Sequence, residues 1–174
     1  MTPHPRGPDP GAIYEAELAY VWSALRRLGV PGHDREDLAH EVFVTALERL
    51  PSFDAARPLR PWLFGIALRV VARQRRRARY VREIPAEAPD AVDGGPPPDE
   101  AAVAGQEQRL VLEALEALDL DRRAVVVLHD LDGHPIPEVA RALNLRLNTA
   151  YSRLRLGRAE FVAAVRRLRG GTKA

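Results

Sequence analysis

The chain has 174 residues, of which 46% are hydrophobic and 29% are charged, and it contains no cysteine. This length fits one medium domain or two small ones, and the lack of cysteine excludes disulfides, cysteine-ligated zinc and thiol catalysis. Apolar runs of about 18 residues and an N-terminal apolar signal region are both missing, so we expect a cytoplasmic protein with no membrane span and no signal peptide.

The formal net charge of +2 is unevenly distributed. Residues 1–82 hold 14 basic and 9 acidic side chains, and residues 105–174 hold 12 basic and 9 acidic ones. Each of these basic blocks is a candidate for binding a polyanion. Residues 83–104 between them hold six acids, no base and five prolines, so we expect a flexible linker that does not fold alone.

The hydrophobic pattern predicts helices and no convincing strand, so the expected fold class is all-α. We expect two small helical domains, 11–82 and 105–170, joined by the acidic linker 83–104 and preceded by a disordered tail over residues 1–10. The predicted helices cover residues 12–28, 34–50, 61–82, 101–117, 121–131, 136–143 and 148–168. Asp34 is expected to cap the second of these helices, with Asp37 as a weak capping-box partner.

The predicted helix over residues 34–50 has an apolar side and an acidic side. The acidic side carries Asp37, His40, Glu41, Val44 and Glu48. It is either a solvated face, a docking face for a basic partner, or a general acid–base site that uses Glu36, Asp37, His40 and Glu41. Catalysis is the least favoured interpretation, because exposed carboxylates keep ordinary pKa values and no metal, nucleophile-elbow or phosphate-loop motif is present. We therefore expect no enzyme activity, no cofactor and no metal.

Residues 61–82, PWLFGIALRVVARQRRRARYVR, predict a helix with three different sides. A core stripe holds Leu63, Ile66, Ala67 and Val70, whereas Arg75 and Arg79 are expected on the far side, solvated or facing phosphate. A third stripe holds Trp62, Arg69, Arg73, Arg76 and Tyr80. Aromatic rings stack on unpaired bases and guanidinium groups pair with phosphate, so this stripe favours an opened nucleic-acid strand. The alternative is that Trp62 packs in the core and Tyr80 is a partly exposed end.

Residues 134–161, HPIPEVARALNLRLNTAYSRLRLGRAEF, predict a helix-turn-helix. Pro137 lies in the first turn, Asn144 suits a left-handed turn, Leu145 would fill the core between the helices, and Asn148 or Thr149 would cap the second helix. The buried side of that helix is expected to hold Ala150, Leu154, Gly157 and Phe161. Gly157 either permits close packing of this helix or is a mild conflict that costs about 1 kcal/mol relative to alanine. The alternative is a helical hairpin that packs and does nothing else.

The outer side of the second helix carries polar and basic groups. Asn148, Ser152 and Arg155 point outward, flanked by Tyr151 and Leu156, and are candidates for contacts to base edges. Thr149, Arg153 and Arg158 lie to the sides and suit phosphate contacts. The arginine-rich face and the small Ala140 and Ala150 favour DNA binding over a plain hairpin.

Two sequence blocks in this order resemble a bacterial RNA polymerase sigma factor of the extracytoplasmic-function (ECF) group, in the sigma-70 family. The first is DREDLAHEVFVTALERL followed by RPWLFGIALRVV, and the second is LEALDLDRRAVVVLHDLDGHPIPEVARALNLRLNTAYSRL. The resemblance covers nearly all of residues 12–168. It implies a non-enzymatic protein that binds core polymerase, recognises promoter DNA, helps to melt it and directs transcription initiation. The alternative function is a stand-alone helix-turn-helix regulator, which would not account for the acidic helix or the Trp–Arg stripe.

The resemblance also implies a role for each surface. The clamp helices of the polymerase's largest subunit would bind Asp37, His40, Glu41, Val44 and Glu48. The minus-ten promoter element would be melted and read by Phe53, Asp54, Trp62, Arg69, Arg73, Arg76, Arg77 and Tyr80, with the loop 52–58 capturing a flipped base. The minus-thirty-five element would be read by Asn148, Thr149, Tyr151, Ser152, Arg153, Arg155 and Arg158. The linker would thread near the polymerase active site and the RNA exit path, as an acidic mimic of nascent RNA, and an anti-sigma factor is a further possible partner.

Five positions depart from the family pattern. His40 replaces the usual Gln, Arg69 and Arg73 replace Asn and Asp, Asn144 replaces Gly, and Leu156 replaces Arg. The minus-ten preference and some DNA contacts are therefore expected to differ from those of relatives.

Overall fold

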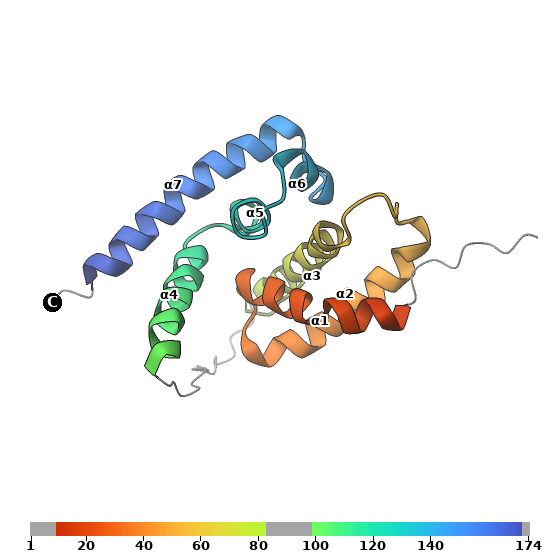
Figure 1. The fold of residues 1–174 in the computed structure, drawn as a ribbon, viewed down its shortest axis with the longest axis horizontal. Helices are drawn as coiled ribbons and strands as arrows, with labels where there is room; N and C mark the ends of the chain where they lie inside the picture. The colour runs from red at the N-terminus through yellow and green to blue at the C-terminus, as the bar shows by residue number, and fades with distance from the viewer. Residues whose placement is uncertain (1–9, 83–98, 172–174) are drawn as a thin grey trace, which may run out of the picture.

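The computed structural model describes residues 10–82 and 99–171, and Figure 1 shows their arrangement. Residues 1–9 of the expected tail and most of the expected linker lie outside the described residues, whereas Pro10, expected in the tail, begins α1. The elements are α1 Pro10–Arg27, η1 Gly32–Asp34, α2 Arg35–Arg49, η2 Leu50–Ser52, α3 Leu59–Arg82, α4 Asp99–Glu116, α5 Leu120–Val126, η3 Val127–Leu131, α6 Ile136–Ala142 and α7 Leu147–Gly171. The described segments contain no strand, which confirms the all-α class. Because α4 begins at Asp99, residues 99–104 of the expected linker are helical.

Helices α1, α2 and α3 pack together in the N-terminal half, which we define as residues 10–82 (Figure 1). The predicted core stripe of α3 is buried, and Leu63, Phe64 and Ile66 are fully shielded from solvent. Helix α1 ends in a Schellman motif, in which Gly29 N donates to Arg26 O and Val30 N donates to Leu25 O, both at 3.0 Å. Gly29 has a φ of 83°, a left-handed conformation that glycine adopts without strain.

The start of α2 differs from the expected cap. Asp34 precedes the helix, but its side chain accepts no capping hydrogen bond from the backbone. Instead its Oδ2 accepts a hydrogen bond of 3.0 Å from Nε2 of Gln74 on α3. The expected side-chain cap was therefore wrong, because a partner distant in sequence competes for the same carboxylate.

Helices α4 to α7 form the C-terminal half, which we define as residues 99–171. The predicted helix over 121–131 is α-helical only to Val126 and continues as the π-helix η3. Helix α7 crosses α5 at Gly157, where an added Cβ would lie 2.8 Å from Val126 Cγ2. Gly157 therefore permits a close approach of the two helices.

Helices α6 and α7 form the predicted helix-turn-helix. Asn144 adopts a φ of 55° in the turn, and Leu145 N donates to Ala140 O at 2.8 Å. Asn144 thus occupies the left-handed position that glycine usually takes. The expected cap at Asn148 or Thr149 was wrong, because α7 already begins at Leu147 and both residues lie in its first turn.

The two halves pack against each other. Helix α5 lies between α7 and the N-terminal half (Figure 1). One continuous hydrophobic core includes Leu25 and Leu63 from the N-terminal half together with Val125 and Val139 from the C-terminal half. In this arrangement the halves form one packed body.

Within the two described segments, no helix has both the length and the apolar character needed to cross a membrane.

Candidate nucleic-acid and protein interfaces

The outer face of α2 places acidic and apolar side chains together at the surface. Its exposed members are Asp37, His40, Val44 and Glu48. Val44 exposes 42% of its surface, which is a large fraction for an apolar side chain. Glu41 is half-buried because its carboxylate pairs with the guanidinium of Arg73 on α3. The structure therefore brings four of the five predicted residues to one open face and draws the fifth toward α3.

Two aromatic side chains of α1 extend this face and were not predicted. Tyr14 and Trp22 expose 43% and 39% of their surfaces. They line an open hollow between α1 and α2 whose other walls include Asp37 and His40. Helical periodicity places Trp22 at the edge of the apolar stripe of α1. The sequence could therefore have indicated that this side chain is only partly buried.

The catalytic interpretation of α2 lacks the environment that it requires. Glu36, Asp37 and His40 are all exposed, and Glu41 is engaged by Arg73. Acid–base catalysis by carboxylates depends on burial or on neighbouring charges that shift their pKa values. The arrangement instead resembles a charged docking face.

The loop before α3 rests on the first turn of that helix. The rings of Phe53 and Trp62 lie 4.6 Å apart between centroids and are tilted by 43°. Trp62 is half-buried and packs on the hydrophobic core. Asp54 accepts a hydrogen bond of 3.0 Å from Ala56 N and lies 3.3 Å from the Arg57 guanidinium. In this arrangement one side of the Trp62 ring is covered by Phe53 and the loop is held in a compact turn.

The arginine stripe of α3 divides into engaged and open groups. Arg73 pairs with Glu41, whereas Arg76 and Arg77 are exposed and Tyr80 exposes 77% of its surface. Partial burial, together with the nearby charge of Arg49, lowers the pKa of Arg69. Arg69 is exposed as well, so the stripe is open to a large anionic partner from Arg69 to Tyr80, and among the described residues only Arg73 of the stripe is engaged in an ion pair.

Arg75 lies elsewhere than expected. We expected it on the far side of α3, solvated or facing phosphate, but it is half-buried and its Nη2 donates to the Leu28 carbonyl at 2.7 Å. The last carbonyls of a helix lack partners within the helix, and Leu28 is the residue that follows α1. Burial, with the like charge of Arg79 nearby, lowers the pKa of Arg75.

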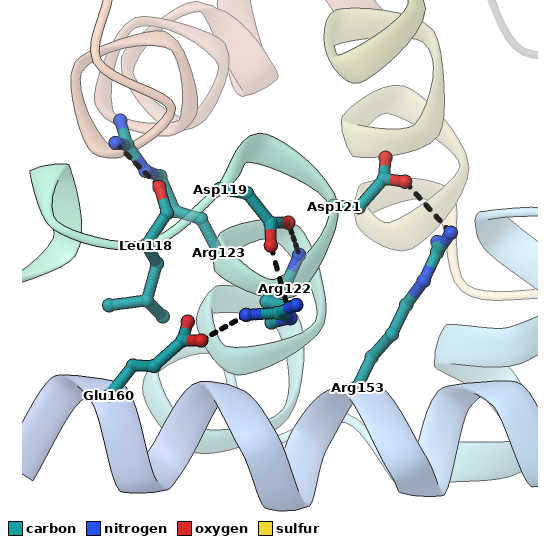
Figure 2. A network of polar contacts seen from close by, with 7 residues as sticks. All are labelled: Leu118, Asp119, Asp121, Arg122, Arg123, Arg153 and Glu160. Carbon is teal, nitrogen blue, oxygen red and sulfur yellow. Dashed lines mark hydrogen bonds and ion pairs between the residues drawn. The ribbon is translucent and has the colours of Figure 1, made fainter.

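Arg123 on α5 binds the same carbonyl from the C-terminal half. Its Nη1 donates to Leu28 O at 3.0 Å and its Nη2 donates to Leu118 O at 3.1 Å. Figure 2 shows this side chain pointing toward α1, whereas Arg122 points toward Glu160 on α7. Arg123 is only 4% exposed. Its burial, and to a smaller extent the like charge of Arg75, lowers its pKa to about 10. At neutral pH it remains charged, held by backbone carbonyls.

Asp132 makes a second polar connection between the halves. It follows η3, accepts a hydrogen bond of 2.8 Å from the Tyr20 hydroxyl and pairs with the Arg27 guanidinium, both on α1. Its side chain is 8% exposed. Burial and the adjacent carboxylate raise the pKa of Tyr20 well above its ordinary value. Sequence reasoning missed Asp132 and Arg123, because no local pattern marks a residue whose partner lies in the other half.

The outer face of α7 is open at its N-terminal end. Asn148, Tyr151, Ser152, Arg155 and Leu156 are exposed there, and Tyr151 exposes 52% of its surface. Thr149 is half-buried, toward the side of the helix. The polar residues predicted to reach base edges thus share one accessible surface.

The two arginines predicted to contact phosphate are engaged in ion pairs. Arg153 Nη2 lies 2.8 Å from Asp121 Oδ2, and Figure 2 shows this side chain reaching from α7 to α5. Arg158 binds both carboxylate oxygens of Asp130, with its Nε 2.9 Å from Oδ2. This bond raises the pKa of Arg158. In order to contact DNA, each arginine would have to release its carboxylate partner or bind a DNA phosphate at the same time.

Comparison with known proteins gives matches in both halves. The family model described as Sigma-70 region 2 matches residues 13–80, and the one described as Sigma-70, region 4 matches residues 108–161. The RNA polymerase sigma factor NccH of Alcaligenes xylosoxydans xylosoxydans is 33% identical over 158 residues, which cover 88% of this chain and 84% of that protein. The ECF RNA polymerase sigma factor SigL of Mycobacterium tuberculosis is 29% identical over 144 residues, which cover 82% of this chain and 81% of that protein.

The fold is also similar to a solved structure. The structure of CnrH in complex with the cytosolic domain of CnrY matches with a TM-score of 0.60 at 27% sequence identity. The match covers 88% of this chain and 85% of that chain, so the likeness extends over both halves.

Proposed function

This chain belongs to the sigma-70 family of RNA polymerase sigma factors, in the ECF group, and we propose that it acts through one polymerase surface and two promoter surfaces. As a sigma factor it directs transcription initiation. The observation that carries this conclusion is that both matched regions occur in one chain in the order of the family. The two-domain division of the sequence, with the acidic linker between, is part of the proposal.

The proposed polymerase surface is the outer face of α2. Its exposed acids would meet basic groups of the clamp helices of the largest subunit, and Val44 would bury its exposed apolar surface against them. His40, which stands where most relatives have Gln, is exposed in the middle of this face. The open charge of the face supports the assignment.

The proposed minus-ten surface runs from the loop 52–58 along α3. Arg76, Arg77 and Tyr80 are exposed and suit phosphate contacts and base stacking on a melted strand. Phe53 lies on Trp62 at the other end of the same surface. Within this proposal, Arg69 and Arg73 give the chain a more cationic surface than its relatives have.

The proposed minus-thirty-five surface is the outer face of α7, which would enter a major groove as the recognition helix. Asn148, Ser152 and Arg155 would contact base edges, and Arg153 and Arg158 would contact phosphates at its sides. No catalytic role belongs to this proposal, and the protein would act in the cytoplasm with the polymerase. The similar protein CnrH was solved in complex with the cytosolic domain of CnrY. We therefore also propose that this chain binds a protein partner of the anti-sigma type.

The test is reconstitution of the full chain with core polymerase and a promoter identified by transcript mapping after overexpression. We expect a stable holoenzyme that starts transcripts at the mapped site. Asp37→Arg should weaken holoenzyme formation by about tenfold or more, because it places like charges together in the interface. Glu107→Arg, which reverses an exposed acid on α4, is the matched control and should leave the affinity unchanged. If DNA is bound but no holoenzyme forms, the chain acts as a stand-alone regulator and the proposal fails.

A further inference from the structure

The two arginines that are proposed to contact phosphate lie on opposite flanks of α7. Arg153 and Arg158 are separated by about 140° around the helix axis. The buried Leu154 and Gly157 lie between them, on the side of α7 that packs against α5. A recognition helix in a major groove runs between two phosphate backbones, so each flank faces one of them. The carboxylate that is paired with each arginine therefore lies beside a group that would meet phosphate.

On one flank, the ion pair leaves part of the arginine open. Arg158 Nε donates to Asp130 Oδ2 at 2.9 Å, and Arg158 Nη2 donates to Asp130 Oδ1 at 2.5 Å. This fork does not use the hydrogens of Nη1. Although both bonds are formed, Arg158 still exposes 54% of its side chain. A phosphate oxygen can therefore bind Arg158 while Asp130 stays in place.

The backbone around Asp130 is held by its neighbours. Asp130 belongs to η3, in which Val127 and Leu128 are fully buried. After η3, Asp132 N donates to Val127 O at 2.9 Å and His134 N donates to Leu128 O at 3.0 Å. Only 28% of the Asp130 side chain is exposed. The carboxylate is thus a fixed anchor, and a bidentate pair sets the plane of a guanidinium as well as its position.

The ion pair on the other flank has the opposite exposure. Arg153 exposes 28% of its side chain, whereas Asp121 exposes 58%. Asp121 lies in the first turn of α5, and Figure 2 shows Arg153 reaching toward it from α7. A phosphate that approaches this flank would be repelled by the more exposed carboxylate and would have to displace it from Arg153.

We propose that Asp130 is a positioning residue for DNA binding, which holds the Arg158 guanidinium in the orientation in which its free edge binds a backbone phosphate. This inference rests on the proposed minus-thirty-five role of α7. Because the long side chain is already ordered by Asp130, it loses less conformational freedom when phosphate binds. Asp121 is instead a competitor for Arg153. The two carboxylates therefore have opposite effects on DNA affinity.

Asp130→Asn and Asp121→Asn are matched variants. Each removes one negative charge beside the same helix and keeps nearly the same side-chain shape. If charge alone mattered, both changes would strengthen DNA binding. We expect Asp121→Asn to strengthen it, but Asp130→Asn to weaken it by about fivefold, because Arg158 is no longer held for its charge-assisted bond to phosphate.

Fluorescence anisotropy of a labelled upstream promoter duplex measures these affinities. The duplex is titrated with holoenzyme reconstituted from the full chain and core polymerase, at several salt concentrations. Each phosphate contact contributes about 0.9 to the slope of log affinity against log salt concentration. Asp130→Asn and Arg158→Ala should therefore each lower the slope by about 0.9, whereas Asp121→Asn should not lower it.

A double variant separates positioning from a structural role. In the Arg158→Ala background, Asp130→Asn removes a repulsive charge and has no arginine to release, so it should no longer weaken binding. A loss of affinity that persists in this background, or that leaves the salt slope unchanged, would show that Asp130 supports the fold alone and would overturn the inference. Equal or tighter binding by Asp130→Asn would overturn it as well. Failure of the unmodified holoenzyme to bind the duplex would instead refute the proposed minus-thirty-five surface itself.

Discussion

Arg73 connects two of the proposed surfaces. Its guanidinium pairs with Glu41, which belongs to the polymerase face of α2, although Arg73 itself belongs to the minus-ten stripe of α3. The two side chains expose 51% and 35% of their surfaces, so the pair contributes no more than about 1 kcal/mol to stability. Its importance would instead lie in specificity, because each partner is withdrawn from the macromolecule that it would otherwise contact.

A charge swap separates the two roles of Glu41. We expect Glu41→Arg to weaken polymerase binding without unfolding the chain, and Arg73→Ala to leave polymerase binding intact. The double variant Glu41→Arg with Arg73→Glu restores an ion pair with reversed polarity, yet it should bind polymerase as poorly as Glu41→Arg alone. Titration of labelled chain with core polymerase and thermal melting are the measurements. Recovery of affinity in the swapped variant would show that Glu41 serves only to hold Arg73.

Arg153 and Arg155 are neighbours in sequence with different surroundings. Arg153 pairs with Asp121, whereas Arg155 is exposed on the outer face of α7. Arg155→Ala should change the base preference at one or two upstream positions, where each lost base contact costs about 1–3 kcal/mol. Arg153→Ala should weaken binding on most sequences alike, and Asp121→Asn, which frees Arg153, should strengthen it. Selection of bound sequences from a random pool measures both effects, and an unchanged profile for Arg155→Ala would refute its role.

At the scale of elements, the crossing of α5 and α7 depends on Gly157. A Cβ there would lie 2.8 Å from Val126 Cγ2 and 3.4 Å from the Arg122 carbonyl. The ion pair of Arg122 with Glu160 lies one turn farther along the same contact. The orientation of the recognition helix on the rest of the C-terminal half is therefore set by backbone proximity as well as by charge.

Gly157→Ala should destabilise the protein, although alanine is the better helix former. Overpacking costs about 1–3 kcal/mol, and because the added Cβ also approaches the Arg122 backbone we expect this cost to exceed the roughly 1 kcal/mol gained in helix propensity. Gly105→Ala gains the same propensity without a clash and should be neutral or stabilising. Urea unfolding followed by circular dichroism measures both variants. A stabilised Gly157→Ala would mean that α7 can shift on α5 without loss.

The helices were predictable because their signals are local. The stripe of Leu63, Ile66 and Ala67 follows helical periodicity, and each of these side chains is buried. Asn144 was predictable for the same reason, since its left-handed backbone follows from its own side-chain chemistry. The expected cap at Asp34 failed because Gln74, which is 40 residues away, binds that carboxylate. Likewise, no pattern within α3 or α5 predicts that Arg75 and Arg123 share one carbonyl of Leu28.

At the scale of the whole molecule, the shared core makes the halves thermodynamically dependent on each other. Apolar residues from both halves form one cluster, and the buried Arg123 lies at their junction. Separation would expose apolar surface and free the guanidinium to bind water. We therefore expect the chain to unfold as one cooperative unit.

The two tryptophans of the chain provide a direct check of this cooperativity. Trp22 lies in the N-terminal half and Trp62 borders the helix-turn-helix, so their fluorescence reports on that half and on its contact with the C-terminal half, whereas far-ultraviolet circular dichroism reports on the helices of both. Urea transitions followed by the two signals should coincide in the unmodified chain. They should separate in Asp132→Ala, which removes a connection between the halves. Two distinct transitions in the unmodified chain would show that the halves unfold independently.

The carbonyl of Leu28 is a hydrogen-bond acceptor that no substitution at that position can remove. It accepts both Arg75 and Arg123 through the main chain, which every amino acid possesses, so no codon change at position 28 can delete the acceptor. The Leu28 side chain is fully buried, and its replacement would damage the core instead. A screen for alleles that loosen the contact between the halves should therefore return changes at Asp132 and Arg123, while changes at position 28 act by damaging the core.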